Sequence, residues 1–396
     1  MQSGVPLGVA LPILVKAIVE VPDLCKSVAR GIYKKHVSSV FDYYLREDGT
    51  STSLWVMSFR ITNLCNHRCA VCAQWGDSGY NFARPNSEIV ETVPLETYKR
   101  VIDETAHLSP HIYITGGEPF LYRHLVPFVN HIKKHDLSVQ IVTNGVMLER
   151  DGEEIVDNQW DVLCVSIDGT REIHDECRGV AGAYDTLLRG VGHIQELKAK
   201  RGVHKPYIIP ITTISETNAH VLVESLEAAR ALQPDGMVVY YSWFTTQEIG
   251  ERHVEVMERS LGCTPTAWKG YVRENGSIDT AALVEGVRRV RATDYGYPIL
   301  FVPNLALEEI PTYYENPQEM FGYKRCVAPW FMVDIMPNGD VVTCRDHPDY
   351  LVGNIRNDSL LTIYNNERYK AFRNALRDSK DGLFPICARC CGLMGY

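Results

Sequence analysis

Residues 65–72 read Cys65-Asn66-His67-Arg68-Cys69-Ala70-Val71-Cys72, and they follow an apolar run at 54–61. Three cysteines at CxxxCxxC spacing supply one thiolate fewer than a closed tetrahedral metal site uses. A metal position without a protein ligand is free to bind and activate a small molecule. The alternative is a structural zinc with His67 as fourth ligand, although a residue between two ligands tends to point away from their shared metal. The spacing therefore favours an open iron-sulfur site.

The composition sets limits on fold and partners. With 396 residues, of which 45% are hydrophobic, the chain is long enough for two domains or for one large domain with appendages. A net charge of -9, without a basic cluster interleaved with aromatics, argues against a nucleic-acid partner. Many of the twelve cysteines gather at 65–72 and 387–391, which favours metal binding in a reducing, cytoplasmic location. We expect Cys164, Cys177 and Cys263 to be small buried side chains.

The first 50 residues form an N-terminal helical extension. Its apolar stretch at 7–19 is too short to span a bilayer and lacks a basic leader, so we predict neither a transmembrane segment nor a cleaved signal. Apolar residues at helical spacing between 13 and 33 favour a helix whose stripe packs on the main domain, with Cys25 buried in it. Because lysines and arginines accompany the stripe, peripheral membrane contact through this helix is the alternative.

Beyond the extension, strand-like and helix-like runs alternate along the chain. We expect strands at 54–61, 111–115, 138–143, 161–167, 207–214 and 236–243, and helices near 95–107, 121–135, 184–199 and 218–232. This order predicts an α/β fold with six parallel strands and helices outside, with the ligand site at the C-terminal ends of the strands. The predicted divisions are 1–50 for the extension, 51–245 for a partial barrel, 246–322 for a helical insertion or bridge, and 323–396 for a small C-terminal α+β domain.

Residues 55–243 resemble the radical SAM superfamily in two motifs. One is the loop of Cys65, Cys69 and Cys72, and the other is Gly116-Gly117-Glu118-Pro119 after the second strand. The resemblance implies a partial (β/α)6 TIM-like barrel whose cysteines bind a 4Fe-4S cluster. It also implies that Gly116, Gly117, Glu118 and Pro119 hold the methionyl amino group of S-adenosylmethionine, with glycines allowing a close ligand approach.

Polar residues at two further strand ends fit the same family. Asn144 follows the third strand, and Ser166 and Asp168 close the fourth. The resemblance implies that they line the nucleoside and amino-acid parts of S-adenosylmethionine, and that Arg178 pairs with its carboxylate through a planar donor fork. Ordinary turn and cap chemistry is the alternative for Asn144, Ser166 and Arg178.

One position departs from the family pattern. Val71 stands where the family usually has an aromatic residue that helps to seat adenine. We therefore expect adenine to contact Trp75 or the fifth strand near Ile214. The loop 76–93, which is rich in Gly, Pro, Asn and Ser, is expected to cover the barrel mouth as a lid.

The C-terminal part gathers a second set of cysteines. Cys326, Cys344, Cys387 and Cys390 resemble the twitch or SPASM extension, which implies one auxiliary 4Fe-4S cluster, because the full pattern has seven cysteines and this chain ends at Tyr396. Asn338-Gly339 predicts a two-residue hairpin with Cys326 and Cys344 facing each other across adjacent strands. Cys391 is a spare thiol, an alternative ligand or an aid to metal insertion. A four-cysteine zinc site is the alternative.

The resemblance implies reductive cleavage of S-adenosylmethionine to a 5′-deoxyadenosyl radical, with electrons from a low-potential donor such as flavodoxin or ferredoxin. We expect an oxidoreductase that removes hydrogen from a small molecule and passes an electron to the auxiliary cluster. The alternatives are a peptide maturase acting on a ribosomally made precursor and a non-enzymatic iron-sulfur or zinc module.

Substrate-facing residues are expected near the auxiliary cysteines and at the barrel mouth. Arg345 and Asp346 directly follow Cys344 and are candidates for a carboxylate clamp and a proton acceptor. Tyr240, Tyr241 and Trp243 end the sixth strand, where core packing is the favoured role.

Overall fold

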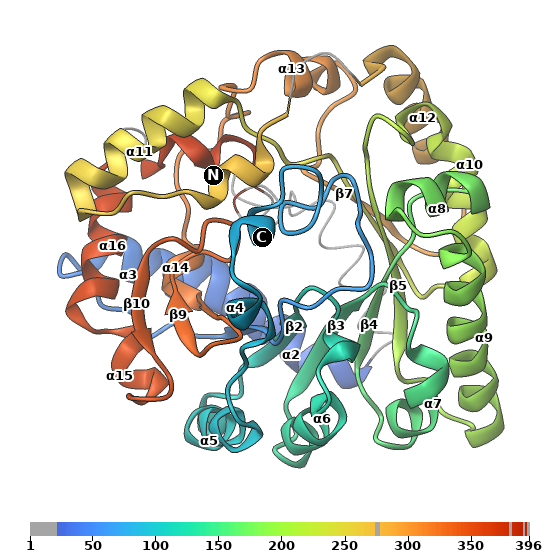
Figure 1. The fold of residues 1–396 in the computed structure, drawn as a ribbon, viewed down its shortest axis with the longest axis horizontal. Helices are drawn as coiled ribbons and strands as arrows, with labels where there is room; N and C mark the ends of the chain where they lie inside the picture. The colour runs from blue at the N-terminus through green and yellow to red at the C-terminus, as the bar shows by residue number, and fades with distance from the viewer. Residues whose placement is uncertain (1–21, 274–277, 380–381, 391–392, 394–396) are drawn as a thin grey trace.

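The computed structural model describes residues 22–273, 278–379, 382–390 and 393, and one ten-stranded sheet runs through it. Seven parallel strands follow one another in the sheet in chain order (Figure 1). They are β1 Val56–Arg60, β2 His111–Thr115, β3 Ser138–Thr143, β4 Val162–Ser166, β5 Tyr207–Thr213, β6 Met237–Tyr240 and β7 Ile299–Val302. The two edge strands of the sheet, β10 Leu351–Asn354 and β7, do not pair with each other, so the sheet does not close and its parallel strands form an open partial barrel.

The parallel strands are short apolar runs because both of their faces are covered. In β1 every residue is buried, and Met57 and Phe59 have no exposed surface. Helices between the strands cover the outer face, as Figure 1 shows for α5, α6, α7 and α9. The main helices of this part are α5 Leu95–Thr105, α6 Leu125–Lys134, α7 Leu148–Asp157, α8 Arg171–Arg178, α9 Ala183–Arg201 and α10 Leu222–Ala229.

Several elements were not expected from the sequence, among them strand β7 and helix α7. Strand β7, a four-residue run next to two prolines, extends the parallel sheet within the region predicted to be a helical insertion. All six predicted strands are present, and β7 adds a further parallel strand after them. Helix α7 was missed because its sequence is mostly polar and contains Gly152, and only its buried face, with Leu148, Ile155 and Val156, carries an apolar signal. The helices between β6 and residue 322 are α11 Gln247–Leu261, the 3-10 helix η7 Ala267–Tyr271, α12 Thr280–Ala292 and α13 Glu309–Glu315.

The C-terminal strands continue the same sheet. Strand β8 Met332–Ile335 pairs in parallel with β1 and antiparallel with β9 Asp340–Val342, which in turn pairs with β10 Leu351–Asn354. The predicted hairpin is present, but its turn spans residues 336–339: Gly339 has φ +91° and its N–H donates to the Met336 carbonyl at 2.9 Å. The remaining helices here are α14 Ala328–Phe331, α15 Leu360–Tyr364, α16 Glu367–Asp378 and the short 3-10 helix η9 Pro385–Arg389.

The described part of the N-terminal extension is helical. It comprises α2 Pro22–Tyr33, the π-helix η1 Lys34–Ser38 and α3 Ser39–Leu45. Asp42 anchors it, accepting hydrogen bonds from the hydroxyls of Ser51 (2.9 Å) and Ser53 (2.6 Å). The predicted buried stripe fails at Ile32, which is 40% exposed, while the stripe residues before 22 lie outside the described residues. Nowhere in the described chain is a helix both long and apolar enough to traverse a bilayer.

Candidate active site and cluster sites

The loop 65–72 leaves β1 at its C-terminal end and is held against α8. The N–H groups of Arg68 and Ala70 donate to the carbonyls of Arg178 (3.2 Å) and Cys177 (3.3 Å). The Arg68 guanidinium donates a hydrogen bond to the Cys65 carbonyl at 2.9 Å, and the Cys72 N–H donates to the Cys69 carbonyl at 3.0 Å. These hydrogen bonds fix the backbone of the loop.

The environment of the three thiols suits an iron-sulfur cluster. Burial raises the pKa of Cys65 to about 12 and also raises the pKa of Cys69, so thiolates here need a cationic partner such as cluster iron. Cys72 lines a large cavity, so this corner of the site faces open space. Burial also lowers the pKa of His67 to about 4, and neither of its ring nitrogens has a hydrogen-bond partner among the described residues.

The two glycines of Gly116-Gly117-Glu118-Pro119 are required by the chain itself. A Cβ on Gly117 would lie 2.2 Å from the Leu64 carbonyl oxygen, and one on Gly116 would lie 2.8 Å from that of Thr62. The N–H of Gly117 donates to Thr62 O at 2.8 Å. Residues 62–64 therefore approach both glycines closely, and the close approach of a ligand to them stays a prediction.

Glu118 ties the ends of β2 and β3 together. Its carboxylate accepts from Thr143 Oγ1 (2.7 Å), Phe120 N (3.1 Å) and Asn144 N (2.8 Å), and burial raises its pKa to about 6. The Asn144 amide donates to Asn66 Oδ1 at 2.7 Å and so reaches the cysteine loop. Pro119 begins a short 3-10 helix, Pro119–Leu121. None of these residues lines the cavity. Their hydrogen bonds instead join the strand ends to one another and to the cysteine loop.

A cavity of about 490 Å³ opens beside Cys72 at the C-terminal ends of the strands. Three predicted cofactor residues line it: Ser166, Asp168 and Arg178. Asp168 pairs with Arg178 at 2.6 Å and accepts from Thr213 N at 2.9 Å, and Arg178 donates to Cys69 Sγ at 3.7 Å. Arg178 therefore links the cysteine loop to the cavity wall.

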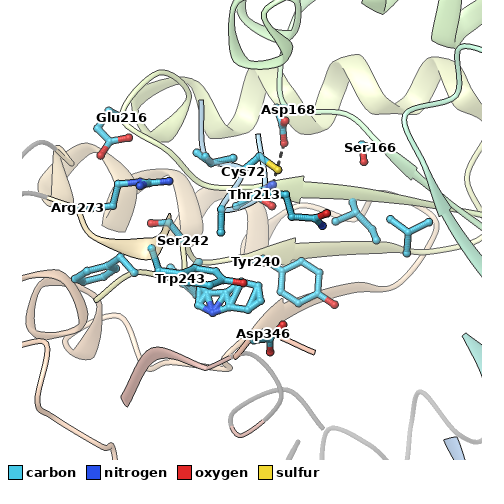
Figure 2. Close-up of a pocket in the computed structure, with 18 of the residues that line it drawn as sticks. Cys72, Ser166, Asp168, Thr213, Glu216, Tyr240, Ser242, Trp243, Arg273 and Asp346 are labelled. Atoms are coloured by element: carbon cyan, nitrogen blue, oxygen red, sulfur yellow. Dashed lines mark hydrogen bonds between the residues drawn. The ribbon is translucent and has the colours of Figure 1, made fainter. Parts of the chain in front are cut away.

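Aromatic side chains form much of the remaining wall. Tyr240, Tyr241 and Trp243 line the cavity, so these residues do more than fill the core. Figure 2 shows Cys72 and Asp168 on one side of the cavity and Asp346 on the other, with Tyr240 between them. Sequence reasoning did not single out several of the lining residues: Arg60, Tyr113, Glu216, Tyr271, Arg273 and Glu315.

Of the two places expected to contact adenine, Trp75 is not in this wall, whereas the fifth strand near Ile214 contributes to it. Trp75 donates its ring N–H to the Asn63 carbonyl at 2.8 Å, and the Arg68 guanidinium lies 4.5 Å from its ring centre. Ile214 is fully buried, and Ile211 and Thr213 line the cavity from β5 instead. The predicted lid at 76–93 contains the 3-10 helix η2 Tyr80–Ala83 and helix α4 Asn86–Val90.

The second set of cysteines surrounds a small buried cavity of about 70 Å³. Its wall contains Cys326, Cys344, Cys387 and Cys390. Burial raises the pKa of Cys326 to about 11, that of Cys387 to about 12 and that of Cys344 well above its usual value, so this donor set also suits bound iron. The expectation that Cys326 faces Cys344 across adjacent strands is wrong, because Cys326 precedes helix α14.

The other cysteines separate by burial. Cys164 and Cys177 are buried, as expected for small core side chains, whereas Cys263 is only half-buried. The predictions for Cys391 and for the Cys25 side chain lie outside the described residues.

Arg345 and Asp346 lie in the walls of both cavities. Arg345 lies 4.4 Å from the Tyr113 ring centre and 3.6 Å from Asp334, and its carbonyl accepts from Arg60 at 2.8 Å. Asp346 accepts from the Cys390 thiol at 3.7 Å. This pair therefore joins the substrate-sized cavity to the second cysteine site.

Comparison with known families agrees with both cysteine sites. The radical SAM superfamily matches residues 59–222, and the SPASM iron-sulfur cluster-binding domain matches residues 326–391. The chain therefore has a radical SAM domain and a C-terminal SPASM domain. A radical SAM core with a SPASM domain implies S-adenosylmethionine and two 4Fe-4S clusters. These matches favour the clusters over the zinc alternatives at Cys65–Cys72 and at the C-terminal cysteines.

Three similar proteins show how diverse the relatives are. Fe-coproporphyrin III synthase of Methanosarcina barkeri is 31% identical over 150 residues, which cover 37% of this chain and 36% of that protein. PqqA peptide cyclase of Rhodopseudomonas palustris is 23% identical over 76% of this chain and 70% of that protein. A tungsten-containing aldehyde ferredoxin oxidoreductase cofactor-modifying protein of Pyrococcus furiosus is 25% identical over 83% of this chain and 85% of its own length.

A solved structure supports the fold. Streptococcus suis SuiB superposes with a TM-score of 0.58 at 14% identity, covering 83% of this radical SAM chain and 70% of SuiB. The chain spans only 36% of the length of the Fe-coproporphyrin III synthase and 50% of the length of an AdoMet-dependent heme synthase of the same organism, to which it is 29% identical.

Proposed function

We propose that this radical SAM protein oxidises a small molecule held in the cavity between its two cluster sites. One observation carries the proposal: Cys72 of the first site and Arg345 and Asp346 beside the second line the same cavity of about 490 Å³. A substrate in this space lies between the group that removes hydrogen and the group that accepts an electron. When bound, the first cluster and S-adenosylmethionine supply the hydrogen-abstracting radical, and the auxiliary cluster supplies an electron acceptor.

The residues of the chain have positioning roles in this proposal. Cys65, Cys69 and Cys72 hold the first cluster, and Cys326, Cys344, Cys387 and Cys390 hold the second. Arg178 and Asp168 orient S-adenosylmethionine beside Cys72, with Ser166 contributing a polar contact from the end of β4.

The cavity wall positions the substrate. The aromatic residues Tyr240, Tyr241 and Trp243 exclude water, which protects a reactive intermediate from side reactions. Arg345 offers a cation to an acidic group of the substrate. Asp346 receives the proton that leaves when an alcohol-type carbon is oxidised.

A peptide substrate is the second candidate. PqqA peptide cyclase matches most of this chain, which favours a maturase acting on a ribosomally made precursor. The match to the cofactor-modifying protein covers even more of the chain and favours a non-peptide substrate. Either substrate requires a low-potential electron donor such as flavodoxin or ferredoxin.

Product analysis of the reconstituted protein tests the proposal. Protein with both clusters should contain about eight irons and, when reduced with dithionite, release 5′-deoxyadenosine from S-adenosylmethionine. Deuterium transfer into 5′-deoxyadenosine from labelled candidates, including short peptides, would then identify the substrate class. Failure to form any 5′-deoxyadenosine in protein with full iron content would refute the enzymatic proposal.

A further inference from the structure

Three side chains that could bind a metal ion lie close together on the outer surface of the protein. None of them belongs to either cysteine site. Asp103 belongs to α5, His131 to α6, and His135 is the residue at the C-terminal cap of α6. The Nε2 atoms of His131 and His135 lie 2.7 and 2.8 Å from the same oxygen, Asp103 Oδ1. The three potential ligand atoms all lie within 4.8 Å of one another.

We propose that Asp103, His131 and His135 bind a divalent transition-metal ion of the zinc type. Two imidazole nitrogens and one carboxylate oxygen form a ligand set that zinc uses, with water in a fourth position. Calcium and magnesium prefer sites made entirely of oxygen ligands, so the two histidines select against them. The ion would replace the hydrogen-bonding protons that now link each ring to Asp103.

The local structure prepares this arrangement. His131 and His135 are four residues apart, so both rings emerge from the same face of α6. The C-terminal end of a helix carries partial negative charge, which stabilises a cation beside His135. The side chains of His131 and His135 are only 19% and 31% exposed. The folded chain therefore already restricts both rings, and metal binding would cost little further conformational entropy.

The position of the site points to a structural role. Helices α5 and α6 lie side by side on the outside of the partial barrel (Figure 1), and none of the three residues lines the substrate-sized cavity. A bound ion would join α5 to α6 and stabilise only the folded chain. This proposal does not depend on the reaction that the enzyme catalyses.

Zinc analysis of the complete protein tests the proposal. Untagged protein with both clusters reconstituted is dialysed against zinc chloride and then against metal-free buffer, and zinc is measured per chain. The double variant His131→Ala/His135→Ala removes two ligands, and His107→Ala, an exposed histidine just after α5, is the matched control. We expect wild type and His107→Ala to retain about one zinc more than the double variant.

X-ray absorption at the zinc edge identifies the ligands. Nitrogen and oxygen neighbours at about 2.0–2.1 Å support the proposal, whereas sulfur at about 2.3 Å places zinc at a cysteine site and overturns it. Equal zinc content in all three proteins also overturns it. If the double variant is unstable, Asp103→Asn serves instead, and it must weaken zinc binding at least tenfold for the proposal to stand.

Discussion

Asp168 and Arg178 form a 2.6 Å ion pair at the point where the cysteine loop meets the cavity wall. The side chains are 2% and 13% exposed, so the pair is largely removed from water. Breaking a buried pair by removing one charge is far more costly than never burying it. Because Arg178 also donates to Cys69 Sγ, the pair links the cysteine loop to the wall of the cavity.

The first prediction concerns this pair. Asp168→Asn leaves the Arg178 charge uncompensated and should lower the free energy of unfolding by about 3–5 kcal/mol. It should also weaken S-adenosylmethionine binding at least tenfold, measured by calorimetry on reconstituted protein. Asp185→Asn is the control, because its partner Arg171 is 53% exposed and a surface pair contributes about 0–1 kcal/mol. Equal effects of the two variants would contradict the prediction.

The second prediction separates the two clusters. Cys387→Ala/Cys390→Ala removes two thiols of the C-terminal cavity and should reduce iron from about eight to about four per chain. Cleavage of S-adenosylmethionine should continue, because the first site is intact, while product formation should fall at least a hundredfold. Cys72→Ala should abolish cleavage instead. Loss of 5′-deoxyadenosine in the double variant would show that the two sites are not independent.

The third prediction tests the close approach at Gly117. A Cβ there would lie 2.2 Å from the Leu64 backbone oxygen, which cannot move aside as a side chain does. Gly117→Ala should therefore destabilise the protein by about 1–3 kcal/mol or more and distort the cysteine loop, lowering iron content. Gly192→Ala is the matched control, since no atom lies within 4 Å of its added Cβ and alanine favours the helix. Thermal unfolding and iron analysis measure both effects.

The fourth prediction follows from Glu118. Burial raises its pKa from 4.5 to about 6, so the folded state holds its proton more tightly than the unfolded state does. Its contribution to stability is fully present below pH 4.5 and is lost as pH rises toward 6, by about 2 kcal/mol. Glu118→Gln should flatten the pH dependence of the unfolding midpoint between pH 4.5 and about 6. An unchanged slope would rule out a raised pKa.

The fifth prediction concerns the exposed apolar side chains of the N-terminal helices. Tyr33, Val37, Phe41 and Tyr44 are each more than half exposed, and basic residues accompany them. Peripheral membrane contact, the alternative raised by the sequence, predicts sedimentation of the protein with anionic vesicles and a several-fold loss of binding in Phe41→Ser. Phe82→Ser, which removes an equally exposed ring elsewhere, should bind as wild type. Absence of vesicle binding by the wild type would contradict membrane contact through this surface.

The local sequence determined the chemistry of the two cysteine sites and most of the parallel sheet. CxxxCxxC spacing defines a three-thiolate loop whatever surrounds it, and apolar runs such as 111–115 and 138–143 coincide with the observed strands. These features depend on residues that are close together in the chain, so they can be predicted from the sequence alone.

Only the tertiary structure decided what lies between the sites. Strand β8 pairs with β1, which brings Arg345 and Asp346 to the cavity that Cys72 also lines. Nothing near residue 345 in the sequence indicates that pairing, because it joins segments more than 270 positions apart and depends on burial of both strands. The same is true of Gly117, whose need for a missing Cβ comes from a backbone oxygen on a different loop.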